Sequence, residues 1–288
     1  MIIQAKNLTH IYGGGTPFEK VALDNVNIDI KKGDYVGIIG HTGSGKSTLI
    51  SHFNAILKPT SGQVLVDGED LWQDDKKKRI ETRFKVGLVF QYPEYQLFEE
   101  TVYKDIAFGP KNMGLDDAEI DARVRSALDF VGLSDKYLDK SPFELSGGQK
   151  RRVAIAGVMA LSPKVLILDE PAAGLDPKGR DEILARIKDY HTQTGCTVLL
   201  VSHSMEDIAS NANSIIVMNK SHVMMHSSVP EVFERAEELE KIGLDIPQIT
   251  KVFISLNNMG FNVSKNIYTV DDAEREILSA LKGGDANA

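Results

Sequence analysis

Gly40-His41-Thr42-Gly43-Ser44-Gly45-Lys46-Ser47 is the stretch that decides the fold of this 288-residue chain. It matches the pattern G-x-x-x-x-G-K-[ST], in which the backbone N–H groups of a glycine-rich loop cradle phosphates. The apolar residues 35–39 predict a buried strand before the loop, and residues 46–57 predict a helix after it. A glycine turn with an exposed lysine is the alternative, but the flanking strand and helix are the context that a phosphate-binding loop requires. We therefore expect residues 40–47, the phosphate loop, to bind a nucleotide.

Side chains of the phosphate loop and of its surroundings predict where the parts of a nucleotide lie. Lys46 is expected to neutralise β- and γ-phosphate oxygens during catalysis, and Ser47 is expected to ligate magnesium. Thr48 offers a hydroxyl to the α-phosphate, and Tyr12 is a candidate to stack on adenine, with packing in the core as its alternative. The pattern predicts ATP and Mg²⁺ as cofactors, with nucleotide contacts from Tyr12, Gly40, His41, Thr42, Gly43, Ser44, Gly45, Lys46, Ser47 and Thr48.

Polar residues follow three of the predicted strands, where chemistry at a bound phosphate is expected. The apolar run 165–168 ends in Asp169 and Glu170, whose side chains can take different tasks because neighbours on a strand point to opposite sides. Asp169 suits the magnesium shell, and Glu170 suits a water lined up to attack the γ-phosphorus. Gln91 is placed to reach metal and water, and His203 to reach the γ-phosphate or that water. The alternative for each residue is an ordinary solvated or structural strand end.

A second glycine-rich loop, Leu145-Ser146-Gly147-Gly148-Gln149, lies about a hundred residues further on and carries no lysine. Ser146 can cap the helix that follows it, with the glycines allowing the turn. Ser146 and the backbone N–H groups of Gly147 and Gly148 can also form an anion nest at the helix N-terminus, and the two roles are compatible. One nucleotide does not need two such loops, so the second suggests a site completed by another subunit. Asp176, soon after the acidic pair, is expected to sense that neighbouring site.

Bulk composition narrows the class of protein. Apolar residues make up 42% of the chain and charged residues 26%, as in an ordinary soluble globular protein. The net charge of −8 argues against a nucleic-acid-binding surface. No run approaches the roughly 18–20 apolar residues that cross a bilayer. The single cysteine, Cys196, fits a reducing cytosol, so a connection to a membrane would come through a partner.

The order of apolar patterns predicts an α/β fold with a mixed, mainly parallel sheet. Short strands in the first thirty residues form an N-terminal β part, and Val165–Leu168 and Thr197–Val201 read as strands buried on both faces. We expect a core domain over residues 1–220 with a helical subdomain at about 92–145. Residues 221–288 are expected to form a small, mostly helical accessory domain, in which Thr269–Asp272 resembles a helix start.

Together these motifs, in this order, resemble the ATP-binding-cassette (ABC) ATPases over about residues 1 to 225. In that family two cassettes close head to tail, and each ATP lies between one phosphate loop and the partner's second loop. The resemblance therefore implies a P-loop NTPase fold and ATP hydrolysis, with Ser146, Gly147, Gly148 and Gln149 contacting the partner's nucleotide. The one small departure is Ala172, where the family often has threonine.

A narrower resemblance comes from residues 91–98, Phe108-Gly109-Pro110, Gly15–Glu19 and the helical tail, which look like the energy-coupling factor (ECF) importers, and most like the second ATPase of their heterodimeric pair. This implies a related ATPase partner, a transmembrane coupling subunit, membrane substrate-binding subunits for vitamins or transition metals, and a peripheral position on the cytoplasmic face of the cell membrane. Residues 91–98, the docking segment, would contact the coupling subunit.

Three other functions remain open at this stage. A motor for a dedicated cobalt or nickel importer would share the architecture. A soluble ATP-driven machine on DNA or ribosomes is disfavoured by the acidic balance and by the single cassette. A regulatory module that holds ATP without hydrolysing it is disfavoured by the intact Glu170 and His203.

Overall fold

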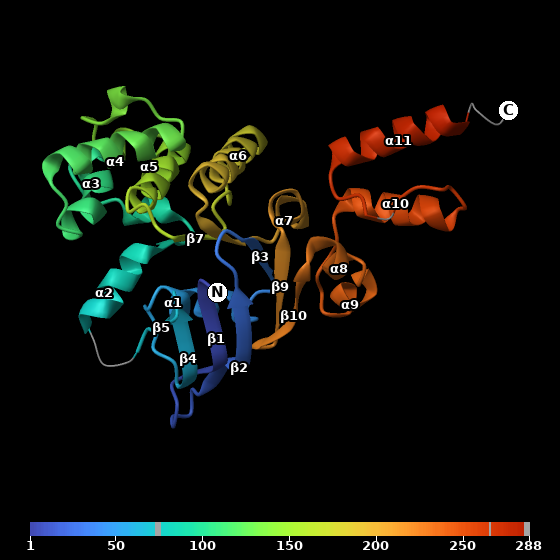
Figure 1. The fold of residues 1–288 in the computed structure, drawn as a ribbon, viewed down its shortest axis with the longest axis horizontal. Coiled ribbons are helices and arrows are strands. Elements are labelled where there is room, and N and C mark those ends of the chain that lie inside the picture. The colour runs from blue at the N-terminus through green and yellow to red at the C-terminus, as the bar shows by residue number, and fades with distance from the viewer. Residues whose placement is uncertain (73–75, 265, 285–288) are drawn as a thin grey trace.

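A computed structural model describes residues 1–72, 76–264 and 266–284. Its centre is a six-stranded sheet in the order β10-β9-β3-β8-β7-β6, with β9 and β10 paired antiparallel and the other neighbours parallel (Figure 1). Four adjacent strands of this sheet are buried along their whole length, as expected for strands covered on both faces. The mixed, mainly parallel sheet is thereby confirmed. The strands are β3 (Tyr35–Ile39), β6 (Val86–Val89), β7 (Val165–Asp169), β8 (Thr197–Val201), β9 (Ser214–Asn219) and β10 (His222–Ser228).

A second, antiparallel sheet has the order β2-β1-β4-β5 and contains the N-terminus. Its strands are β1 (Ile3–Tyr12), β2 (Lys20–Ile30), β4 (Ser61–Val66) and β5 (Glu69–Asp70). Helix α1 (Lys46–Phe53) shares one buried apolar cluster with both sheets, through Leu49 and Phe53. The helix that begins in the phosphate loop is thus held between two sheets, and this packing fixes the position of the loop.

Helix α1 ends earlier than the sequence pattern predicts. The pattern continues to residue 57, but the helix stops at Phe53 and Ala55 has a φ of +56°. The backbone N–H of Leu57 turns back to the carbonyl of Ser51. This tight turn leads the chain into β4.

The helical subdomain forms a separate lobe beside the central sheet, drawn in green in Figure 1. Val124 and Leu128 of α4 pack in one buried cluster with Val153 of α5, which follows the second loop. The lobe therefore includes α5 as well as the helices inside the range 92–145. Its helices are α3 (Val102–Asn112), α4 (Asp117–Phe130) and α5 (Gly147–Met159), with short 3₁₀ turns at Pro93–Gln96, Asp135–Tyr137 and Pro142–Glu144. Helix α2 (Lys76–Lys85) precedes β6 and contacts that strand of the central sheet.

Helices α6 (Pro177–Thr194) and α7 (Met205–Asn211) follow β7 and β8. Helix α6 begins directly after Asp176, because the carboxylate of Asp176 caps it by accepting the N–H of Gly179 at 3.0 Å. Ser204 caps α7 in the same way, through the N–H of Asp207 at 3.1 Å. Both caps stand beside the carboxyl edge of the sheet.

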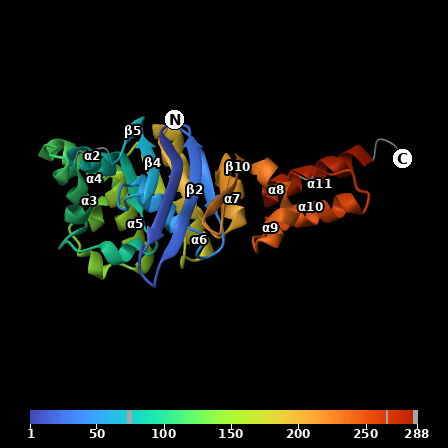
Figure 2. The ribbon, with the colours of Figure 1, turned by 90° about the horizontal axis from the view of Figure 1, so that it is seen from below.

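The C-terminal helices extend away from the rest of the molecule in Figure 2. The central sheet runs through β10 to Ser228, past the boundary expected at residue 221, before α8 (Val229–Phe233) and α9 (Ala236–Lys241). Helices α10 (Gln248–Asn258) and α11 (Val270–Gly284) enclose a small core of Phe253, Ile267 and Ala273. The predicted helix start is confirmed, because the hydroxyl of Thr269 accepts the N–H of Asp272.

Two further features bear on handling the protein. Within the described residues, every helix is too short or too polar to cross a lipid bilayer. The Cys196 thiol is buried, with Sγ 3.2 Å from the carbonyl oxygen of Pro163. Burial raises the pKa of this thiol to about 12.

Candidate functional site: a nucleotide cleft and a second loop

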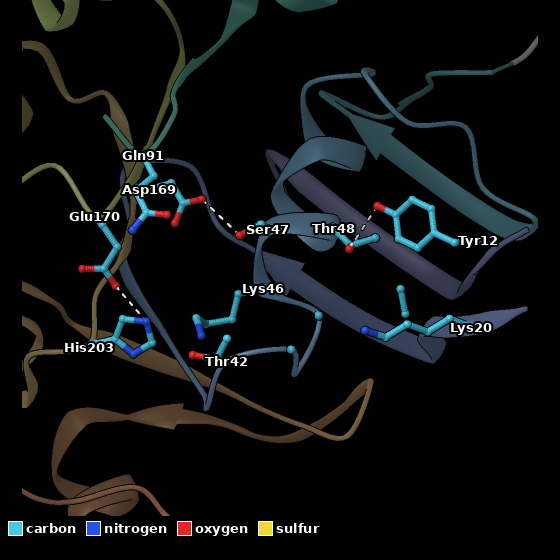
Figure 3. A pocket seen from close by; sticks show the side chains of 13 residues that line it. Tyr12, Lys20, Thr42, Lys46, Ser47, Thr48, Gln91, Asp169, Glu170 and His203 are labelled. Carbon is cyan, nitrogen blue, oxygen red and sulfur yellow. Dashed lines mark hydrogen bonds and ion pairs between the residues drawn. The ribbon is translucent and has the colours of Figure 1, made fainter. Parts of the chain in front are cut away.

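A cleft of about 320 Å³ opens where α1, the carboxyl edge of the central sheet and the N-terminal sheet meet (Figure 3). Its walls come from segments far apart in sequence, because parallel strands end at the same edge. The residues that line it are Tyr12, Lys20, Ala22, Thr42, Gly43, Gly45, Lys46, Ser47, Thr48, Gln91, Asp169, Glu170 and His203.

The glycines of the phosphate loop are required by its own backbone. Gly40 has a φ of +152°, and a Cβ there would lie 2.4 Å from the carbonyl oxygen of Met218. Gly45 has a φ of +108°, and a Cβ there would lie 2.5 Å from the carbonyl oxygen of Ala22. Both contacts are with backbone atoms of other segments, so no side chain can be accommodated without moving the loop.

Lys46 points into the cleft from the first turn of α1. Its Nζ donates to the carbonyl oxygens of Gly40 at 2.5 Å and of His41 at 3.2 Å. Burial lowers the pKa of Lys46, while the carboxylates of Glu170 and Asp169 act to raise it. The Lys46 ammonium is therefore partly desolvated, and a highly charged anion bound in the cleft would strongly stabilise its charged form.

Asp169 ends β7 and turns toward α1. Its Oδ2 accepts the hydroxyl of Ser47 at 3.1 Å, and Gln91 lines the same part of the cleft. Hydroxyl, amide and carboxylate oxygens are hard donors of the kind that Mg²⁺ prefers, and a few protein donors suffice because the ion keeps water and phosphate ligands. Ser47, Gln91 and Asp169 thus fit a magnesium site.

Glu170 has a φ of +53°, a backbone conformation that non-glycine residues rarely adopt and that directs its side chain into the cleft. Burial and the neighbouring Asp169 raise the pKa of Glu170 to about 7. Its Oε1 lies 3.5 Å from Nε2 of His203 and is buried without a hydrogen-bond partner among the described residues. Burial lowers the pKa of His203, so at neutral pH this contact is not an ion pair. A buried carboxylate oxygen with a free lone pair is suited to accept a proton from water.

Tyr12 stands at the other end of the cleft and is 42% exposed, so its ring is available to a ligand. Its hydroxyl lies 3.3 Å from the hydroxyl of Thr48, and its ring meets His10 edge to face. Lys20, labelled in Figure 3, is a cleft residue that the sequence reasoning missed. It reaches the cleft because the register of β1 and β2 sets it opposite Tyr12, and no local motif marks it.

The second loop lies at another site and caps α5. The hydroxyl of Ser146 accepts the N–H of Gln149 at 3.4 Å, and the Gln149 Oε1 accepts the N–H of Ser146 at 3.0 Å. Ser146, Gly148 and Gln149 line a depression of about 470 Å³ that also contains Asp176. The cap that the sequence offered as an alternative is present. It leaves the loop open toward this depression.

The structure therefore separates the predicted site residues into two groups. Eleven of them line the cleft: Tyr12, Thr42, Gly43, Gly45, Lys46, Ser47, Thr48, Gln91, Asp169, Glu170 and His203. Gly40, His41 and Ser44 shape the phosphate loop without lining the cleft, and Ser146–Gln149 and Asp176 do not line it either. Their contacts with a nucleotide stay predictions.

Comparison with known proteins agrees with this arrangement. The ABC transporter family profile matches residues 23–173. The chain also resembles the dimeric ATP-binding cassette MJ0796 bound to ADP and Pi, with a TM-score of 0.71 and 30% identity over 79% of this chain and 98% of that one. It resembles cbiO1 of Clostridium perfringens, part of the ABC transporter complex cbiONQ, with a TM-score of 0.73 and 40% identity over 86% of this chain and 96% of that one. The chain belongs to the ABC transporter ATPases.

Within this family, the chain is similar to the ATP-binding proteins of one type of transporter. The chain is 56% identical to the energy-coupling factor transporter ATP-binding protein EcfA2 of Clostridium tetani, over the full length of both. It is 55% identical to the protein of the same name from Clostridium perfringens, over 98% of this chain and 99% of that one. The resemblance to ECF importers that the sequence motifs indicate is thereby confirmed. The chain is an ATP-binding subunit of such a transporter and corresponds to the second ATPase of its pair.

Proposed function

We propose that this chain hydrolyses Mg²⁺-ATP at a site that a second ABC ATPase subunit completes, and that the cycle drives vitamin or transition-metal uptake. The observation that carries the proposal is the convergence in one cleft of Lys46, Ser47, Gln91, Asp169, Glu170 and His203. Four separate segments supply these side chains. Their chemistry matches the needs of phosphoryl transfer to water, which are charge stabilisation and positioning.

The chain's own residues have distinct tasks in this mechanism. Lys46 binds the β- and γ-phosphate oxygens, and Glu170 as a carboxylate orients the attacking water and accepts its proton. His203 holds the γ-phosphate or that water in line. Mg²⁺, when bound by Ser47, Gln91 and Asp169, supplies positive charge to the phosphate oxygens.

Replacing the Glu170 carboxylate tests the hydrolytic part of the proposal. Glu170→Gln keeps the shape of the side chain and removes the proton acceptor. We expect ATP to bind with wild-type affinity while turnover falls about 10³-fold, which is within the range for loss of a general base. Steady-state phosphate release by the purified complex measures this. Unchanged release would reject the catalytic assignment.

The second loop supports the proposed partner. The cap uses the N–H groups of Ser146 and Gln149. Gly147 and Gly148 lie between them at the start of α5, and a helix N-terminus of this kind suits an anion brought from outside. The C-terminal helices add exposed apolar side chains, with Val252, Ile277 and Leu278 at least 42% exposed. These are suited to contact between ATPase subunits, in agreement with a heterodimer.

A membrane partner is supported by the docking segment. Tyr95 is 85% exposed and Phe98 59% exposed, beside the half-exposed Tyr92. Glu94 of the same segment forms two hydrogen bonds with the buried guanidinium of Arg151 in α5, at 2.8 and 3.0 Å. Exposed aromatics suit an interface, and the Arg151 pair joins that surface to the helix of the second loop. We infer that the chain binds a transmembrane coupling subunit at the cytoplasmic face of the cell membrane.

Co-purification from membranes in mild detergent tests the partners. A tag on this chain should recover a second ATPase, one coupling subunit and small substrate-binding membrane proteins. The similarity to cbiO1, which is part of the ABC transporter complex cbiONQ, supports a second candidate, the motor of a dedicated cobalt or nickel importer. Recovery of a single, fixed substrate-binding subunit would favour that candidate. Recovery of ribosomes or DNA without membrane proteins would reject both.

A further inference from the structure

An arginine outside the predicted site connects the segment that carries His203 to the start of α6. Arg180 lies in the first turn of α6, and its backbone N–H donates to the carbonyl of Asp176 at 2.9 Å. Its Nη2 donates to the hydroxyl of Ser204 at 2.5 Å and to Oδ1 of Asp207 at 2.5 Å, and its Nε donates to the same Oδ1 at 2.9 Å. Ser204 is the residue directly after His203.

The contact between Arg180 and Asp207 is strong because the Asp207 carboxylate is buried. The side chain of Asp207 is 11% exposed, and burial raises the pKa of its carboxyl while Arg180 opposes that rise. A buried carboxylate is costly unless it is paired, so Arg180 and Asp207 hold each other in one geometry. Ser204 also accepts the N–H of Asp207, which makes the cap of α7 and the arginine contact parts of one network.

The hydrogen-bond network of Arg180 also lies next to Glu170 and His203. A pocket of about 290 Å³ is lined by both Glu170 and His203 and by both Arg180 and Asp207. Ser202, which precedes His203, accepts the N–H of Ser204 at 3.1 Å. His203 is therefore flanked on both sides by residues of the Arg180 network, and a loop of this kind would otherwise be free to move.

We propose that Arg180 is a positioning residue that sets His203 against the reacting phosphate and ties that setting to Asp176, which lies outside the cleft. This inference rests on the proposed function, in which His203 contacts the γ-phosphate or the attacking water. Arg180 itself does not line the cleft. Its loss should change the rate of the chemical step and leave nucleotide binding intact, because the residues that line the cleft do not include it.

The test uses the whole detergent-purified complex and measures single-turnover ATP hydrolysis and ATP affinity. Arg180→Ala should slow the single-turnover rate by about 10- to 100-fold, as expected for a displaced catalytic group, with ATP affinity within twofold of wild type. Arg180→Lys should recover part of the rate, since a lysine can pair with Asp207 without matching the forked contact to Ser204. Lys188→Ala is the matched control. Lys188 also joins α6 to α7, through the carbonyl of Ser210 at 3.0 Å, but at the far end from His203.

A double-mutant cycle with His203→Ala identifies the route of the effect. If Arg180 acts through His203, Arg180→Ala should slow the His203→Ala enzyme by less than twofold. An additive loss, or a loss equal to that of Lys188→Ala, would overturn the inference. A fall in ATP affinity as large as the fall in rate would do the same. Full hydrolysis by His203→Ala alone would instead reject the role of His203 in the proposed function. If Arg180→Ala does not fold, the cycle is run with Arg180→Lys and the same criteria.

Discussion

The two glycine-rich loops use glycine for different reasons. In the phosphate loop, Gly40 and Gly45 have positive φ angles, and a Cβ on either would collide with backbone atoms of the same chain. In the second loop, Gly147 and Gly148 lie in the helix α5 without positive φ. Among the described residues, a Cβ on Gly147 would meet nothing within 4 Å, and one on Gly148 would meet only Leu175 at 3.6 Å.

This difference indicates what each loop must accommodate. The phosphate loop needs glycine to exist in its own fold, whether or not a ligand is bound. The second loop does not need glycine for its backbone or for packing within this chain. Its missing side chains leave room for something that approaches from outside, as the proposed partner nucleotide would. Five substitutions, one of them combined with a change of pH, can break or sharpen this contrast.

The largest effect is expected from a pair of substitutions that assign each loop to a nucleotide. Lys46→Ala should prevent this chain from retaining its own nucleotide. Ser146→Arg should leave that retention intact and reduce hydrolysis at the partner's site by about 10²- to 10³-fold, as for loss of a well-placed donor. Photolabelling with radioactive 8-azido-ATP, counted in each separated subunit, measures retention. The contrast fails if Ser146→Arg removes the label from this chain.

The next largest effect is a loss of folding stability at low pH, caused by His52. His52 in α1 lies behind the phosphate loop, with Nδ1 2.7 Å from the carbonyl of Thr48, and burial lowers its pKa to about 4. The unfolded chain binds this proton near pH 6.5, so the stability that neutral His52 provides is present above pH 6.5 and is lost as the pH falls toward 4. When the pH falls from 7.5 to 4.5, the free energy of unfolding of the wild type should therefore decrease by about 2–3 kcal/mol more than that of His52→Gln.

Urea unfolding at the two pH values measures this difference, because the other titrating groups are shared by the two proteins. Amide hydrogen exchange shows which part of the chain loses protection first. Acid should increase exchange first in α1, since α5 contains no histidine. Equal pH dependence in wild type and His52→Gln would show that His52 does not support the phosphate loop in this way.

The smallest effects should differ in sign between the two loops. Gly45→Ala should destabilise the fold by about 1–3 kcal/mol, because alanine must adopt a left-handed conformation and its Cβ meets the carbonyl of Ala22. Gly147→Ala should be neutral or stabilising by up to about 1 kcal/mol, since it replaces glycine in a helix. Thermal unfolding of the isolated chain compares them. A destabilised Gly147→Ala would mean that the second loop also needs its glycine for folding.

Most of the nucleotide cleft could be predicted from the sequence because its signals are local. A buried apolar run followed by polar residues marks a strand end, and parallel strands bring such ends together. That rule anticipated Gln91, Asp169, Glu170 and His203, and the glycine pattern anticipated Lys46 and Ser47. The same patterns anticipated the mainly parallel sheet.

What the sequence could not supply depends on contacts between distant segments. Lys20 enters the cleft through the register of β1 and β2, which no short motif encodes. The raised pKa of Glu170 follows from burial by several segments. Arg180 looked like an ordinary charged residue on a helix. Its importance becomes visible when α7 places Asp207 and Ser204 opposite it.

The buried thiol of Cys196 has a practical consequence. Thiolates are the reactive form, and a pKa of about 12 leaves almost none at neutral pH. The native chain should therefore resist alkylation, and a cysteine introduced at residue 147 would be its one readily labelled position. A dye or crosslinker attached there would report the approach of a partner subunit in real time, without first removing the native cysteine.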